Sequence, residues 1–126
     1  MIRVMVTGSR DWRDVMTIGQ AIDDVEMFNP NEHEFSLVNG CASGADAIAR
    51  SWAFRLGWKL EDYWPDYVKY DFATANKTRN IEMVDSAPTC VYAFPTTRSR
   101  GTWHAVNYAK QQGYVENETL WIYAEQ

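Results

Sequence analysis

Residues 1–10 read MIRVMVTGSR, an apolar run that ends in a glycine turn. Residues 2–6 are predicted to form a buried strand, which the turn at Thr7-Gly8-Ser9 ends. The segment that follows, residues 15–25, repeats apolar side chains at helical spacing, and Asn29-Pro30 ends that helix. The opening of the chain therefore predicts a strand, a tight turn and a helix, which is the repeating unit of an α/β sheet.

The alternation of strand and helix continues to the end of the chain. The strongest helix signal is at residues 45–56, where apolar side chains recur every three or four positions before Gly57. Further strands are expected at 35–38, 58–63, 89–94 and 120–124, and further helices at about 68–85 and at 102–112. Five strands alternating with four helices predict an α/β fold: a Rossmann-like, doubly wound sheet of mainly parallel strands in one domain, residues 1–126.

The composition is typical of a folded domain with an acidic balance. Of 126 residues, 46% are hydrophobic and 23% are charged, which excludes a disordered chain. The 17 acidic and 12 basic residues give a net charge of −5, and such a surface disfavours non-specific binding to DNA or RNA. The two cysteines, Cys41 and Cys90, make neither a disulfide framework nor a metal quartet.

The N-terminal segment reads as a strand and not as a signal peptide. No apolar stretch approaches the roughly 20 residues that are needed to span a bilayer. The two histidines, His33 and His104, lack metal-ligand spacing with any cysteine or carboxylate. We therefore expect a cytoplasmic protein without a metal or another cofactor.

Ligands of doubly wound sheets bind beyond the carboxyl ends of the strands, where the strand order reverses. The loops after the first, second and fourth strands are therefore the places to expect a site. In the first loop, residues 7–12, Gly8 allows a sharp turn and Arg10 can hold an anion by two hydrogen bonds. The alternative is a plain strand-to-helix turn in which Asp11 or Asp14 caps the helix.

The second loop, residues 40–46, reads GCASGAD. Its small residues let the backbone approach a ligand, and Ser43 and Asp46 also fit a capping box. Capping alone could explain both of these residues. Cys41 lies near a helix N-terminus, which lowers the pKa of a thiol, but a small packed residue is the favoured interpretation.

The fourth loop, residues 95–102, is the strongest candidate for an anion site. Arg98, Arg100 and Gly101 lead into a helix, and helix N-termini favour anions. Hydrogen bonds to charged groups contribute about 1.5–3 kcal/mol each, so two arginines and the amides could support micromolar binding of a phosphate ester before ordering costs. The alternative is a solvated loop with Ser99 or Thr102 as the helix cap.

Five short motifs occur in a fixed order along the chain: TGSRDW at 7–12, GxAxGAD at 40–46, RNxxM at 79–83, AFP at 93–95 and GT at 101–102. Together they resemble the SLOG superfamily of Rossmann-like proteins, and most closely its small YspA-like branch in bacteria and phages. That superfamily includes the LOG phosphoribohydrolases, which release a base from a nucleoside monophosphate, and the DprA proteins, which bind single-stranded DNA. The resemblance covers nearly the whole chain.

The resemblance implies roles for particular residues. It places Arg79 against the ligand and Gly101-Thr102 in a phosphate-binding motif, whose two preceding glycines are replaced here by Arg98 and Ser99. LOG proteins carry a catalytic glutamate three residues after that threonine, where this chain has Ala105. Alanine can neither stabilise an oxocarbenium-like charge nor activate water. This residue therefore argues against LOG-type hydrolysis, but it does not argue against phosphate binding at the same loop.

Other side chains near the loops could act as acids, bases or stacking platforms. Asp46 and Asp85 could supply a carboxylate, and His104 could act as a neutral base; a helix-end aspartate and a helix-surface histidine are the alternatives. Trp12 and Trp103 fall beside the expected site and could stack on a base. Burial against the neighbouring helix is the commoner fate of such rings.

The sequence favours a binding protein or sensor for a phosphorylated nucleoside, such as a nucleoside monophosphate or an ADP-ribose-like compound. One alternative is a hydrolase of N-glycosidic or phosphate bonds that uses Arg79, Asp46 or His104 in catalysis. A further alternative is a single-stranded nucleic-acid binder like DprA, and the resemblance leaves a homo-oligomer open. The residues expected to contact the ligand are Gly8, Ser9, Arg10, Trp12, Gly40, Gly44, Ala45, Asp46, Arg79, Asn80, Arg98, Ser99, Arg100, Gly101 and Thr102.

Overall fold

A computed structural model describes residues 1–124 of the chain, in which strands and helices alternate as the sequence predicts. The elements are β1 (Ile2–Gly8), α1 (Val15–Phe28), β2 (Phe35–Asn39), α2 (Ala45–Arg55), β3 (Lys59–Asp62), α3 (Phe72–Asp85), β4 (Cys90–Phe94), α4 (Arg100–Gln111) and β5 (Leu120–Ile122). The expected α/β architecture is thereby confirmed.

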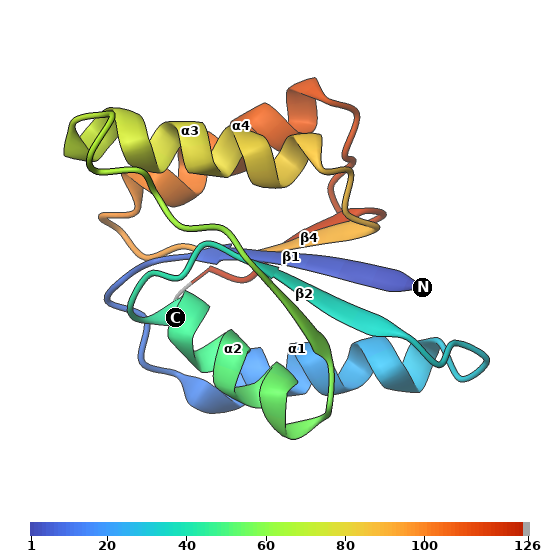
Figure 1. The fold of residues 1–126 in the computed structure, drawn as a ribbon. Coiled ribbons are helices and arrows are strands. Elements are labelled where there is room, and N and C mark those ends of the chain that lie inside the picture. The colour runs from blue at the N-terminus through green and yellow to red at the C-terminus, as the bar shows by residue number, and fades with distance from the viewer. Residues whose placement is uncertain (125–126) are drawn as a thin grey trace.

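The five strands form one parallel sheet in the order β3-β2-β1-β4-β5. Helices α1 and α2 cover one face of this sheet, and α3 and α4 cover the other (Figure 1). The chain leaves β1 toward β2 and β3 on one side, and later returns to place β4 and β5 on the other side. The strand order therefore reverses between β1 and β4, and the loops that follow these two strands meet at the carboxyl edge of the sheet.

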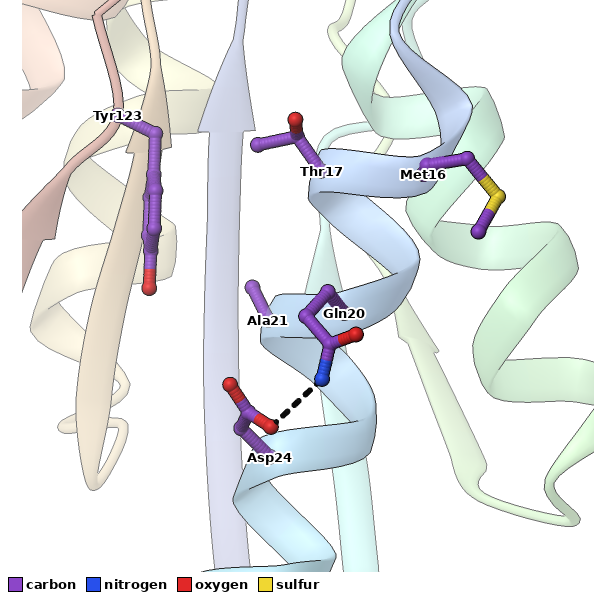
Figure 2. Close-up of a pocket in the computed structure, with 6 residues that line it drawn as sticks. All are labelled: Met16, Thr17, Gln20, Ala21, Asp24 and Tyr123. Atoms are coloured by element: carbon purple, nitrogen blue, oxygen red, sulfur yellow. Dashed lines mark hydrogen bonds between the residues drawn. The ribbon is translucent and has the colours of Figure 1, made fainter.

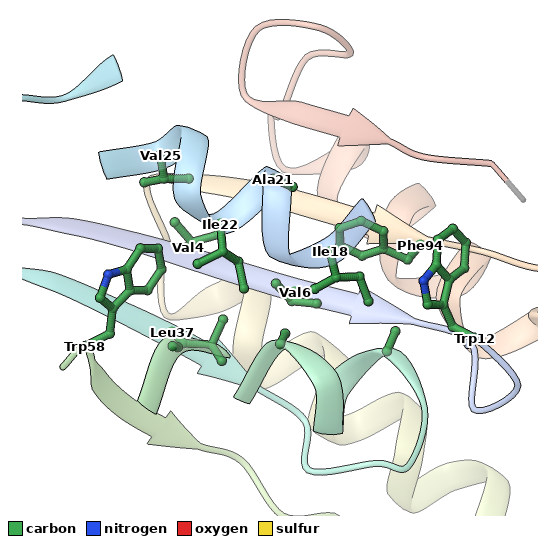
Figure 3. Close-up of a cluster of buried hydrophobic side chains, with 13 residues drawn as sticks. Val4, Val6, Trp12, Ile18, Ala21, Ile22, Val25, Leu37, Trp58 and Phe94 are labelled. Atoms are coloured by element: carbon green, nitrogen blue, oxygen red, sulfur yellow. The ribbon is translucent and has the colours of Figure 1, made fainter. Parts of the chain in front are cut away.

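Two hydrophobic clusters hold the layers together, one on each face of the sheet. Val4 and Val6 of β1 point into the cluster beneath α1 and α2, which also contains Phe94 (Figure 3). Met5, between them, points into the opposite cluster with Val91 of β4. Successive side chains of a strand face opposite sides, so an apolar run through β1 is what a sheet covered on both faces requires.

Helix α3 begins later than the sequence pattern predicts, at Phe72 instead of about residue 68. Asp66 closes a separate turn, because its side chain accepts hydrogen bonds from two of the backbone N–H groups that follow it, at 3.1 and 3.0 Å. Asp71 then caps α3 by accepting the backbone N–H of Thr74 at 2.8 Å. Two polar caps in succession thus divide what reads as one amphipathic segment.

Several other boundaries differ from the prediction by one or two residues. β3 starts at Lys59, α4 starts at Arg100, two residues earlier than predicted, and β5 ends at Ile122. Of the two aspartates considered as caps of α1, Asp14 is the one whose side chain accepts the N–H of Thr17. In the part of the chain that the structure describes, no helix is long and apolar enough to cross a membrane.

Candidate functional site

The loops after β1 and β4 are joined by hydrogen bonds at the point where the strand order reverses. The backbone N–H of Ser9 donates to the carbonyl of Phe94 at 2.9 Å, and its hydroxyl lies 2.8 Å from the hydroxyl of Thr96. The backbone N–H of Thr96 in turn donates to the hydroxyl of Ser99 at 2.7 Å. Ser9 and Ser99 are both buried, so these two predicted ligand residues hold the loops in register.

Glycines at this edge let backbone segments pack on each other. A Cβ on Gly8 would overlap the side chain of Ala45, and a Cβ on Gly44 would overlap the carbonyls of Ser9 and Arg10. Gly44 also has a positive φ of 73°, which favours glycine. The small residues that the sequence places against a ligand are thus surrounded by protein atoms, and their packing positions loop two under loop one.

The N-terminus of α4 is the open part of this edge. Within residues 1–124, the backbone N–H groups of Arg100, Gly101 and Thr102 have no acceptor, and the first helical hydrogen bond runs from Trp103 to the carbonyl of Ser99 at 3.0 Å. No atom lies within 4 Å of a Cβ built on Gly101. Ser99 stands at the capping position but makes no capping hydrogen bond, because its hydroxyl is engaged by loop four itself. Unpaired N–H groups at a helix N-terminus suit an anion.

Two arginines flank this open N-terminus in the sequence, and a third lies in loop one. Arg98 and Arg100 are exposed, and neither has a salt-bridge or hydrogen-bond partner among the described residues. Arg10 reaches from loop one toward α3: its guanidinium lies 5.3 Å from the centre of the Phe72 ring, and its Nη2 donates to the side chain of Asn76 at 3.4 Å. The net charge of the chain is negative, but three arginines belong to loop one, loop four and the first turn of α4.

Arg79 and Asn80 of α3 connect loop two to the first turn of α4. Arg79 is 7% exposed, and its guanidinium donates to the side chain of Asn80 at 2.8 Å and to the carbonyl of Gly40. Asn80 donates to the carbonyl of Gly101 at 3.2 Å. A Cβ on Gly40 would overlap the Arg79 guanidinium, which explains the glycine. The resemblance places Arg79 against a ligand; in the structure its hydrogen bonds, with those of Asn80, join loop two to the first turn of α4.

Asp46 is a buried carboxyl with an unused oxygen. Oδ2 accepts the backbone N–H of Ala42 at 3.2 Å, while Oδ1 is buried and has no hydrogen-bond partner within residues 1–124. Burial raises the pKa of Asp46 to about 7, against the opposing effect of the Arg79 guanidinium. The capping box proposed for Ser43 and Asp46 does not form: Gly44 is the N-cap of α2 and makes no side-chain hydrogen bond.

Two residues considered for chemistry, and the position that holds the LOG glutamate, lie elsewhere or in unfavourable surroundings. Asp85 is at the far end of α3, away from the carboxyl edge, where it accepts a hydrogen bond from Tyr108 at 2.6 Å. Burial raises the pKa of the Cys41 thiol to about 11, contrary to the needs of a nucleophile. Ala105 is fully buried in the apolar cluster beneath α3 and α4, so the position of the LOG glutamate faces the core.

Of the remaining candidates, one lies in the hydrophobic core and two lie on the first turn of α4. Trp12 is buried against Phe94, with ring centres 5.4 Å apart, so its ring cannot serve as a stacking surface. Trp103 is 41% exposed on the first turn of α4. His104 is half-buried with Nδ1 unpartnered among the described residues, and its burial, together with the nearby charge of Lys77, lowers its pKa.

Two residues that shape the site were not predicted as site residues from the sequence. Asn76 of α3 accepts hydrogen bonds from Arg10, Arg79 and Tyr67, at 3.4, 3.3 and 3.2 Å. Asn39, fully buried at the end of β2, accepts from the N–H of Cys41 at 2.7 Å and donates to the carbonyl of Asp46 at 2.9 Å. A polar residue at the end of an apolar strand is the signal that could have identified Asn39.

A cavity of about 340 Å³ lies outside this edge, beside α1 (Figure 2). Its lining residues are Met16, Thr17, Gln20, Ala21, Asp24 and Tyr123. Its one carboxylate, Asp24, accepts a hydrogen bond from Gln20 at 2.9 Å, and no basic side chain lines it. This cavity therefore does not suit an anionic ligand.

Comparison with known proteins agrees with this architecture. The chain belongs to the YspA, cpYpsA-related SLOG family, which matches residues 2–70. The Gene 61 protein of Mycobacterium phage D29 is 36% identical to it over 117 residues, which cover 90% of this chain and 92% of the phage protein. The family match confirms the resemblance to SLOG proteins, and the phage protein shows that a relative occurs in a phage.

A solved structure has the same fold. The X-ray structure of DNA processing protein A (DprA) from Streptococcus pneumoniae superposes with a TM-score of 0.73 at 18% sequence identity. The match covers 92% of this chain but 49% of DprA, so the chain spans about half the length of that protein. At this identity the likeness concerns the fold.

Proposed function

We propose that this protein binds a phosphorylated nucleoside, such as a nucleoside monophosphate or an ADP-ribose-like compound, at the carboxyl edge of its sheet. The observation that carries the proposal is the open N-terminus of α4, where three consecutive N–H groups lack acceptors among the described residues and two unpaired arginines stand beside them. Membership in the SLOG family supports a nucleotide-related ligand.

The expected affinity is modest. Each hydrogen bond from an arginine to a phosphate contributes about 1.5–3 kcal/mol, and the helix N-terminus adds about 0.3–1 kcal/mol. Ordering of exposed side chains such as Arg98 and Arg100 offsets part of this gain. A dissociation constant between about 1 μM and 1 mM corresponds to binding free energies of about −8 to −4 kcal/mol, which is the range we expect.

The proposal is tested by calorimetric titration with ribose 5-phosphate, nucleoside monophosphates and ADP-ribose. We expect Arg98→Ala and Arg100→Ala each to weaken binding about tenfold, since each removes a charged hydrogen bond of more than about 1.4 kcal/mol. Arg55→Ala is the matched control, because Arg55 is an exposed arginine in the last turn of α2, at the other edge of the sheet. Absence of binding at millimolar ligand, or equal effects of all three variants, would contradict the proposal.

A hydrolytic reaction at this edge is the second candidate, and the buried carboxyl of Asp46 favours it. A group with a pKa of about 7 can both accept and donate a proton near neutral pH. If the reaction occurs, chromatography will detect release of base or phosphate from a nucleotide, and Asp46→Asn will abolish it. A nucleotide that binds and remains intact over days would exclude this candidate while leaving the binding proposal in place.

A further inference from the structure

A second cavity, of about 270 Å³, opens at the carboxyl ends of β2 and β3. Its lining residues are Asn39, Cys41, Ala42, Ala47, Arg50 and Trp64. Three of its walls come from loop two, the first turns of α2 and the segment after β3. That segment crosses the carboxyl edge from the α2 layer to the α3 layer (Figure 1). The cavity thus lies at the ends of β2 and β3 on the α2 side, and β1 separates these strands from β4, which leads into α4.

Trp64 is the unusual residue of this cavity. Its side chain is 69% exposed, and among residues 1–124 its ring has no aromatic partner and its indole N–H has no acceptor. Other exposed rings in the same segment are already engaged: Tyr67 and Phe72 stack on each other with ring centres 5.4 Å apart, and Arg10 lies against Phe72. Trp64 therefore offers a free aromatic face at the edge of a cavity.

Arg50 supplies a fixed polar group to the same cavity. Its Nε and Nη2 donate to the carboxylate of Asp62, with the shortest contact at 2.8 Å, so the plane of the guanidinium is held in place. Nη1 has no acceptor within the described residues and can donate to a ring nitrogen or carbonyl oxygen. Ala42 and Ala47 add only small side chains, so Trp64 and Arg50 are the largest groups that line the cavity.

We propose that this cavity binds the nucleobase of the ligand, which stacks on Trp64 and accepts a hydrogen bond from Arg50. Indole and guanidinium groups both stack favourably on flat aromatic rings, and a free N–H on the guanidinium matches the acceptors on the edge of a base. The inference rests on the proposed function for the nature of the ligand. The cavity lies on the α2 side of the sheet and the open N-terminus of α4 on the other side, so a ligand that reaches both is elongated, as ADP-ribose is.

The test separates the two halves of the ligand. Adenosine, guanosine, cytidine and uridine probe the cavity alone, ribose 5-phosphate probes the N-terminus of α4 alone, and ADP-ribose probes both. The chain has six tryptophans, and NMR can observe their indole N–H groups individually, with the Trp64 resonance assigned from Trp64→Phe. We expect at least one nucleoside to shift the Trp64 resonance, while ribose 5-phosphate shifts the backbone N–H of Gly101 and leaves Trp64 unmoved.

Affinities provide the second measurement. Trp64→Ala should weaken adenosine and ADP-ribose about tenfold, because stacking of a base on an aromatic ring is lost, and should leave ribose 5-phosphate within about twofold. Trp64→Phe, which keeps an aromatic face, should retain most of the affinity. Phe54→Ala is the matched control, since Phe54 is similarly exposed, at 70%, near the end of α2.

The inference is overturned if every nucleoside leaves the Trp64 resonance unmoved at millimolar concentration, or if Trp64→Ala binds adenosine and ADP-ribose within twofold of the wild type. A response of Trp64 to nucleosides without any binding of ribose 5-phosphate would support the base cavity and reject the phosphate site. Binding of ribose 5-phosphate without any response to nucleosides would do the reverse.

Discussion

At the scale of single residues, Asp46 is a carboxyl whose surroundings differ strongly from water. Its carboxyl is 4% exposed and one of its oxygens has no hydrogen-bond partner in the described part of the chain. The cost of burying this charge raises its pKa from 3.8 to about 7. The carboxyl therefore binds its proton more tightly in the folded than in the unfolded protein, and the sign of its effect on stability follows.

We expect Asp46 to stabilise the fold in acid and to lose that contribution as the pH rises. Its contribution is complete below about pH 4, where both states are protonated, and is lost through pH 7 as the folded carboxyl ionises. Asp46→Asn stays neutral at every pH. Its free energy of unfolding, measured relative to that of the wild type, should therefore rise by about 2–4 kcal/mol between pH 4 and pH 8. Denaturant unfolding of both proteins at these two pH values measures this difference. An unchanged difference between the two proteins would show that Asp46 is not held as an acid.

At the scale of elements, α3 links the two loops that form the walls of the site. Arg79 donates to the carbonyl of Gly40 on one side, and Asn80 donates to the carbonyl of Gly101 on the other. The two residues are adjacent and bond to each other through the Arg79 Nε, at 2.8 Å. This pair therefore fixes loop two relative to α4 by polar contacts. Elsewhere in this layer, α3 and α4 pack through apolar side chains.

Asn80→Ala should destabilise the protein and loosen the first turn of α4. The change removes the acceptor of a buried guanidinium N–H and the donor to the Gly101 carbonyl, at an expected cost of about 1–3 kcal/mol. Asn107→Ala is the control, because Asn107 is an exposed asparagine on α4 and should change stability by less than about 0.5 kcal/mol. Thermal or denaturant unfolding compares them. Equal stability of the two variants would mean that the Arg79–Asn80 pair contributes little.

At the scale of the whole molecule, the placement of charge matters more than its sum. The chain carries a net charge of −5, yet the exposed arginines Arg98 and Arg100 stand beside an open helix N-terminus at one edge of the sheet. A local positive region of this size suits one small phosphate compound. A long polyanion would extend onto the acidic remainder of the surface, where repulsion opposes binding.

This distribution predicts a shallow dependence of ligand affinity on salt. Proteins that contact six to ten phosphates of DNA lose about 10³–10⁵ in affinity between 50 and 200 mM salt, whereas ADP-ribose should lose less than about tenfold here. Titrations with ADP-ribose and with a single-stranded oligonucleotide at the two salt concentrations measure the salt dependence of both affinities. An oligonucleotide that binds more tightly than ADP-ribose and with a steep salt dependence would favour a nucleic-acid partner instead.

Periodicity predicts the elements of this fold well because it depends on which faces are buried. The apolar run of β1 and the helical spacing at residues 45–56 each identify their element, since these residues pack on the core clusters. The predicted start of α3 was wrong because two aspartate caps, Asp66 and Asp71, act locally and override the amphipathic pattern, whereas its end at Asp85 agrees with the prediction. Trp12 was placed beside a ligand by its position in loop one, but the chain turns its ring inward against Phe94.

The sequence by itself determined the order of elements, the parallel sheet and the edge at which its functional loops gather, because burial periodicity and turn residues are local properties. Only the tertiary structure decided how those residues are used. Gly8 and Gly44 serve packing between segments that are distant in the sequence, Arg79 donates to the carbonyl of Gly40, and Trp64, which belongs to no motif, lines a cavity. These roles depend on contacts between separate segments of the chain, and such contacts exist only once the layers have packed.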